Sequence, residues 1–271
     1  MGHAKSESMV SVFESEVAAR LQMLEGIGYM SAHQGLARSL TAPWWWYAGA
    51  GRQHILHNGT VCFVNTGKVT VAVSALHVYR SYLKDKHEQA NFGCQWGSAT
   101  IEPEKYLLDE NEGLDLVTFS VPEVLRVATR AEVHSPRHWP PEEVKPSEVV
   151  TSGGYPGWLR EEKLDTAELP FVTLTNRVLS VTPENVKLQV DVATIRWGST
   201  VRPHERGLVD FGGISGGPIY RIKETPIETL ELVGFIYESS IKSPTAEEPR
   251  PIGFVFGSHA WRVNVDGRIV T

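Results

Sequence analysis

Short runs of apolar and β-branched residues, separated by turn-forming Gly, Pro, Asn and Asp, recur along most of this chain. Runs of strand length bounded by turn residues are typical of antiparallel β proteins. Those between Ile55 and Val121 predict a first β-barrel, within a unit that we place at residues 49–132. Six later runs predict a second barrel over residues 148–271: 148–155, 169–181, 185–195, 217–222, 230–238 and 252–257. The proline-rich segment 133–147 has the composition of a linker between the two.

Residues 1–48 lack this β pattern and are predicted to form an N-terminal helical extension. An amphipathic helix is expected at residues 8–25, with Ser11 and Glu14 placed for a capping box and Gly26 as its stop. Its apolar face would consist of Phe13, Val17, Leu21 and Leu24. The aromatic run 44–47 has two interpretations: an anchor that docks the extension on the barrels, or an exposed binding patch.

Composition narrows the function classes. The 24 glycines and 16 prolines suit a β protein with many turns, and the formal net charge of −6 argues against a nucleic-acid-binding surface. The apolar runs are too short for a membrane helix, and the N-terminal residues carry no hydrophobic signal segment. These features predict a cytoplasmic protein without a membrane span.

The two cysteines, Cys62 and Cys94, fit that location as reduced thiols, although a bridge between them is geometrically conceivable. The sequence has no Cys-x-x-Cys motif, and the pair His134 and His138, which has His-x-x-x-His spacing, lies in proline-rich sequence typical of a loop. No metal and no other cofactor is therefore expected.

Candidate chemistry begins with the segment Gly213-Ile-Ser-Gly-Gly-Pro218. A serine among glycines is suited to a nucleophilic hydroxyl, because Gly213 can adopt backbone angles that a side chain would forbid. The amides of Gly213 and Ser215 could then point at one carbonyl oxygen and form an oxyanion hole.

A serine hydroxyl needs a base, and that base needs a group to orient it. His77 follows the β-branched run 68–74, at the expected end of a buried strand, whereas most of the other histidines lie in loop-like or charged sequence. Asp115 stands between two leucines at the start of the run 114–121. Burying an unpaired carboxylate there would be costly, so Asp115 is expected to have a partner.

These three motifs, in the order His, Asp, Ser, resemble the signatures of trypsin-like (chymotrypsin-fold) serine proteases. The strand-like segments 59–64, 153–157, 232–236 and 252–256 extend the resemblance to roughly residues 50–262. The resemblance implies two six-stranded antiparallel Greek-key β-barrels with the active site in the cleft between them. It implies a serine endopeptidase that hydrolyses polypeptides through His77, Asp115 and Ser215 and an acyl-enzyme.

One departure concerns the residue before the serine. Animal trypsins usually carry an aspartate there that pairs with a new N-terminal ammonium, whereas this chain has Ile214. In this the chain is closer to bacterial peptidases of the high-temperature-requirement type. We expect the loop at 206–214 to be held only by packing and backbone hydrogen bonds, and the extension, a partner protein or a ligand to control activity.

The resemblance also implies a specificity pocket, built from Val209, Asp210, Ile236, Tyr237, Glu238 and Gly253. An acid at its floor would select Lys or Arg, whereas inward apolar side chains, which we favour slightly, would select small or apolar residues. Two other functions remain open: a non-catalytic trypsin-fold interaction module, and a serine esterase that uses the same triad.

Overall fold

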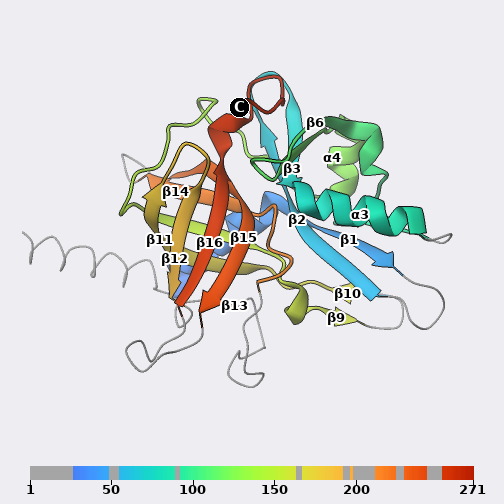
Figure 1. Cartoon of the computed structure of the whole chain (residues 1–271), viewed down its shortest axis with the longest axis horizontal. Coiled ribbons are helices and arrows are strands. Elements are labelled where there is room, and N and C mark those ends of the chain that lie inside the picture. The colour runs from blue at the N-terminus through green and yellow to red at the C-terminus, as the bar shows by residue number, and fades with distance from the viewer. Residues whose placement is uncertain are drawn as a thin grey trace, which may run out of the picture.

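The computed structural model describes residues 27–48, 55–88, 92–162, 167–191, 196–197, 211–223, 229–242 and 252–271. The helix expected at 8–25 lies outside these residues. Within them the chain is mostly β, with two seven-stranded sheets, a short hairpin and three α-helices (Figure 1).

The first sheet is antiparallel, with strand order β5-β4-β1-β2-β3-β7-β6. Its strands are β1 (Thr41–Ala48), β2 (Ile55–Asn65), β3 (Thr70–Ala75), β4 (Cys94–Trp96), β5 (Ala99–Thr100), β6 (Leu107–Asn111) and β7 (Leu116–Ser120). Helix α3 (Leu76–Glu88), α4 (Glu123–Thr129) and the 3₁₀ turn η2 (Pro103–Tyr106) accompany it. An aromatic core that includes Trp44, Trp96 and Phe119 fills the space between α3 and the sheet.

The aromatic run belongs to this sheet rather than to an extension. It lies in β1, which pairs with β2 along its whole length and with β4 on its other side. Trp44 and Trp46 are buried, whereas Trp45 and Tyr47 are half-buried, as the alternation of a strand requires. Residues 41–48 are thus part of the first β unit, which corrects the boundary that we placed after residue 48.

The second sheet closes on itself. Its order is β12-β16-β15-β14-β8-β11-β13, and an additional β11–β12 pairing joins β12 to β11, so that six strands form a barrel and β13 lies outside the ring. The strands are β8 (Val149–Gly154), β11 (Val172–Val181), β12 (Val186–Asp191), β13 (Arg196–Trp197), β14 (Pro218–Lys223), β15 (Thr229–Lys242) and β16 (Ile252–His259). A six-stranded second barrel is therefore present. The first sheet, in contrast, has no closing pairing among the residues that the structure describes.

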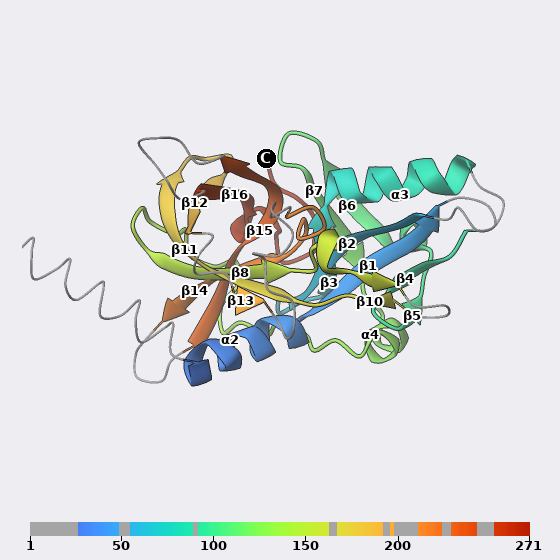
Figure 2. The ribbon, with the colours of Figure 1, turned by 90° about the horizontal axis from the view of Figure 1, so that it is seen from below.

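The two sheets share a third apolar cluster, which contains Cys62 from β2, Tyr220 from β14 and Phe235 from β15. Helix α2 (Ile27–Ser39) falls within the expected helical extension but after the helix expected at 8–25; it lies against β8, β11 and β1 and adds Ala37 to this cluster (Figure 2). The remaining elements are the hairpin β9 (Glu161–Glu162) and β10 (Ala167–Glu168), η3 (Gly157–Leu159) and η6 (Ala260–Arg262). This shared core fixes the two sheets against each other at the place where the candidate site lies.

Residues 133–147, the expected linker, contain no helix or strand, apart from one bridge between His134 and Val64. None of the helices in the described residues is long and apolar enough to cross a membrane.

Candidate active site

Register in the first sheet brings His77 and Asp115 together. Ala75 at the end of β3 pairs with Leu116 at the start of β7, so the residues just beyond this pair face each other. His77 lies in the first turn of α3, and Asp115 occupies the turn before β7 with φ of 47°. Few residues adopt this left-handed conformation, and Asp is among those that tolerate it best.

Asp115 binds His77 at two points. Its Oδ2 lies 2.6 Å from the ring Nδ1, and its Oδ1 accepts the backbone N–H of His77 at 2.8 Å. The Asp115 carbonyl also accepts the N–H of Leu76 at 3.1 Å. A carboxylate at the first amides of α3 caps the helix and interacts favourably with its dipole. The same group thus positions the helix and orients the imidazole.

Ser215 is the second residue of the second of two consecutive tight turns. The N–H of Ile214 donates to Phe211 O at 3.1 Å, and the N–H of Gly217 donates to Ile214 O at 2.8 Å. The third residue of each turn is a glycine with positive φ, Gly213 at 99° and Gly216 at 90°. Such turns favour glycine at this position because φ is positive there.

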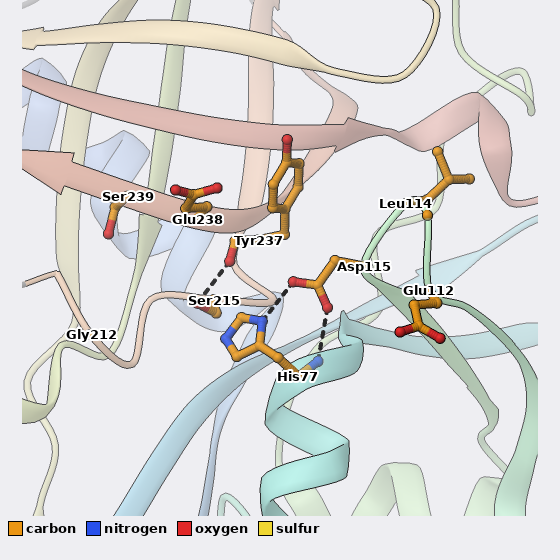
Figure 3. A pocket seen from close by; sticks show the side chains of 10 residues that line it. His77, Glu112, Leu114, Asp115, Gly212, Ser215, Tyr237, Glu238 and Ser239 are labelled. Carbon is orange, nitrogen blue, oxygen red and sulfur yellow. Dashed lines mark hydrogen bonds and ion pairs between the residues drawn. The ribbon is translucent and has the colours of Figure 1, made fainter.

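The Ser215 side chain faces the same cleft as the His77 ring (Figure 3). The cleft has a volume of 560 Å³, and its lining is His77, Glu112, Gly113, Leu114, Asp115, Gly212, Ser215, Tyr237, Glu238 and Ser239. Ser215 Oγ donates to the carbonyl of Tyr237 at 3.3 Å, and no hydrogen bond joins it to His77 in the described part of the chain. Tyr237 has no partner in the β15–β16 register, because a bulge falls between Ile236 and Glu238.

The two candidate oxyanion donors lie on either side of Ile214. Among the described residues, neither the amide of Gly213 nor that of Ser215 has a hydrogen-bond acceptor. Backbone amides without an acceptor beside a serine hydroxyl are the groups that an oxyanion would need.

The residues expected to form the specificity pocket separate into three groups. Val209 and Asp210 lie outside the described residues. Ile236 packs in the barrel core and Gly253 is buried between β12 and β15, so neither lines the cleft. Tyr237 and Glu238 do line it.

The cleft is lined by three carboxylates, those of Glu112, Asp115 and Glu238. Glu112 forms a double contact with Arg80, at 3.1 Å for each oxygen, and this hydrogen bonding lowers the pKa of the Glu112 carboxyl. Glu238 is exposed and has no cationic partner in the described residues. Burial, and then the charges of Glu238 and Asp115, raise the pKa of Tyr237.

One residue beside the site was missed by sequence reasoning. Thr60 of β2 donates its hydroxyl to the carbonyl of Gly213 at 2.9 Å. A side chain therefore holds Gly213, which belongs to the loop 206–214 that we expected packing and backbone hydrogen bonds alone to hold. The contact joins residues far apart in sequence, and nothing in the run Gly59-Thr-Val61 signals it.

Comparison with protein-family models found no match, and comparison with curated proteins found none. Among solved structures, the chain is similar to the Rv3671c protease from M. tuberculosis in its active form, at 16% identity and a TM-score of 0.37, covering 82% of this chain and 78% of that one. It is also similar to a chain from a structure on the coupled folding and binding of the Sesbania mosaic virus VPg protein, at 14% identity and a TM-score of 0.36, covering 83% and 94%. At these TM-scores neither similarity assigns a fold family or an activity, and the function has to be argued from the site itself.

Proposed function

We propose that the protein is a serine endopeptidase of the trypsin-like kind. Ser215 Oγ attacks the scissile carbonyl while His77 Nε2 takes its proton, and Asp115 stabilises the imidazolium. The amides of Gly213 and Ser215 stabilise the oxyanion. His77 then gives the proton to the leaving amine. In the second half, His77 takes a proton from water as the water attacks the acyl-enzyme, and returns that proton to Ser215 Oγ.

The 2.6 Å contact between Asp115 Oδ2 and His77 Nδ1 carries this proposal. It leaves Nε2 as the ring nitrogen free to accept a proton, on a ring that lines the same cleft as Ser215 (Figure 3). A structural histidine–aspartate pair would not need a serine in the same cleft, with its own amide and that of Gly213 both without acceptors in the described residues. Rotation of the Ser215 hydroxyl away from Tyr237 O is needed before attack, and catalytic hydrogen bonds often form only when substrate is bound.

The bond from Ser215 to Tyr237 also favours a second candidate, a non-catalytic interaction module. If that bond persists when a peptide occupies the cleft, the hydroxyl has no base and the protein only binds. A serine esterase would share the triad and differ in the acyl group that the cleft accepts.

Labelling with a fluorophosphonate probe separates these functions. We expect covalent labelling of the wild type, with the adduct mapped to Ser215 by peptide mass spectrometry, and none in Ser215→Ala. Ser239→Ala is the matched control, since Ser239 lines the same cleft outside the glycine turns, and it should label normally.

Absence of labelling in a folded wild type would refute the enzyme and leave the binding module. A labelled protein is then given peptide libraries and p-nitrophenyl esters. Cleavage of esters without cleavage of any peptide would replace the peptidase with the esterase.

A further inference from the structure

The hydroxyl of Thr60 connects the first sheet to the turns that carry Ser215. The backbone N–H of Tyr155 donates to Thr60 Oγ1 at 3.1 Å, and this oxygen donates its own proton to Gly213 O at 2.9 Å. A hydroxyl has one proton, so accepting one bond and donating the other fixes its direction. Thr60 also donates its backbone N–H to the carbonyl of Ser215 at 2.9 Å.

These contacts orient both peptide groups around Gly213. The N–H of Gly157 donates to Gly212 O at 2.7 Å, and in a trans peptide the next N–H points the opposite way. The Gly213 amide therefore points away from Gly157. The second peptide group is held by the bond from Thr60 to Gly213 O. Because Gly213 is a glycine at φ of 99°, its own backbone sterics do little to maintain this arrangement.

Thr60 is itself firmly placed. It is fully buried, and Ser74 Oγ donates to its carbonyl at 2.7 Å. Ile214, the residue between the two amides, contributes an apolar side chain to the barrel core and no polar contact. Among the described residues, the hydroxyl of Thr60 is thus the side-chain group that holds Gly213 O.

We propose that Thr60 is a positioning residue that keeps the oxyanion amide of Gly213 available. This rests on the proposed role of Ser215 as nucleophile. Without the hydroxyl, Gly213 O and the Tyr155 amide lose their partner, and rotation of the glycine peptides lets each find another. Loss of the Thr60 hydroxyl then weakens binding of the transition state rather than binding of the substrate.

The test compares Thr60→Val, which keeps the shape, with Thr60→Ser, which keeps the hydroxyl. Thr66→Val is the matched control, because the buried Thr66 hydroxyl likewise donates to a backbone carbonyl, Val265 O at 2.6 Å, but beyond the end of β2 and outside the cleft. We expect Thr60→Val to reduce kcat and the fluorophosphonate labelling rate about tenfold or more, with KM within about twofold. Thr60→Ser should restore most of both, and Thr66→Val should leave both near the wild-type values.

Hydrogen exchange of the amides of Ile214 and Gly217 gives a readout that does not depend on activity. We expect faster exchange in Thr60→Val than in Thr66→Val. A folded Thr60→Val that labels and exchanges like the wild type overturns the inference, and so does an equal loss in Thr60→Ser. If the wild type is not labelled, the role of Ser215 as nucleophile is refuted, and the positioning role of Thr60 with it. Hydrogen exchange would still show whether the Thr60 hydroxyl holds the turns.

Discussion

Asp115 holds both the ring and the backbone of His77, through Oδ2 at 2.6 Å from Nδ1 and Oδ1 at 2.8 Å from the backbone nitrogen. One carboxylate thereby caps α3 and fixes the imidazole relative to the helix axis. The catalytic step would need this arrangement, because the backbone N–H of His77 holds the carboxylate in place and the carboxylate in turn keeps the ring oriented toward the cleft. A substitution that removes the charge of Asp115 and keeps the shape of its side chain tests this relationship.

Asp115→Asn is expected to keep the fold and lose most of the activity. Asn tolerates the left-handed φ of 47°, and its side-chain oxygen can still accept the His77 amide. Its NH₂ group, however, would donate to Nδ1 and place the ring proton on Nε2, where the base must be free. We expect kcat to fall by about 10⁴ in steady-state assays. Asp109→Asn is the control, since Asp109 accepts the Ile269 amide at 3.0 Å and does not line the cleft; equal losses in both variants would count against the role of Asp115.

Gly216→Ala should destabilise the protein far more than Gly67→Ala. Both glycines have φ near 90°, but a Cβ at Gly216 would collide with Thr60 O and Ser74 Oγ, whereas one at Gly67 meets nothing. Positive φ alone costs Ala about 1–2 kcal/mol, and the collision should bring the loss at Gly216 to at least about 3 kcal/mol. Urea unfolding of both variants measures the difference, and similar losses would show that the turn can move aside.

Sequence patterns placed the candidate site residues through local features. Strand-length runs placed His77 after β3 and Asp115 before β7, and pairing of these strands then brings the two residues together. The glycines around Ser215 indicated tight turns, and Gly213 and Gly216 have the positive φ that such turns use.

Contacts that depend on distant segments could not be read in this way. The hydrogen bond from Thr60 to Gly213 exists only because the two sheets pack together. Ile236 belongs to a run expected near the pocket, but alternation along β15 turns it into the core. The alternation of β1 was present in the sequence, yet a run of four aromatic residues hid it, because half-buried Trp45 is as apolar as buried Trp44.

Both thiols should be unreactive in the native protein. Burial raises the pKa of Cys62 to about 12 and also raises the pKa of Cys94, so little thiolate forms at pH 8. We expect no reaction with Ellman's reagent in buffer and two reactive thiols in guanidinium chloride without reductant. Fewer than two would indicate a bridge between these cysteines, which the structure shows as free.

Glu238 should favour cationic side chains in the substrate. Among the described residues, Glu238 is the cleft carboxylate that contacts no basic side chain, whereas Arg80 neutralises Glu112 and Asp115 binds His77. The apolar preference that we favoured from sequence rested in part on Ile236, which does not reach the cleft. Glu238→Gln is expected to lower kcat/KM for Lys- and Arg-containing peptides about threefold to tenfold, more at low salt, and to leave neutral peptides unchanged. Glu110→Gln, outside the cleft, is the control, and an equal loss on neutral peptides would exclude a charge effect.

His134 should make the protein less stable as the pH falls from about 6.5 to 4. Burial lowers the pKa of its imidazole to about 4, although the charge of Glu231 opposes this, and its Nε2 has no hydrogen-bond partner beside Tyr220. The unfolded chain therefore binds the proton at a higher pH than the folded one, so stability is present above pH 6.5 and is lost below it.

His134→Phe removes this titration and keeps a ring of similar shape. Between pH 8 and pH 5 the wild type should lose about 2 kcal/mol more of its free energy of unfolding than the variant loses. Between pH 8 and pH 4 the extra loss should be about 3 kcal/mol. Urea unfolding at several pH values measures this difference, with the exposed His138→Phe as the control that should follow the wild type. Parallel pH profiles for His134→Phe and the wild type would contradict this prediction. They would mean that His134 binds its proton as readily in the folded chain as in the unfolded one.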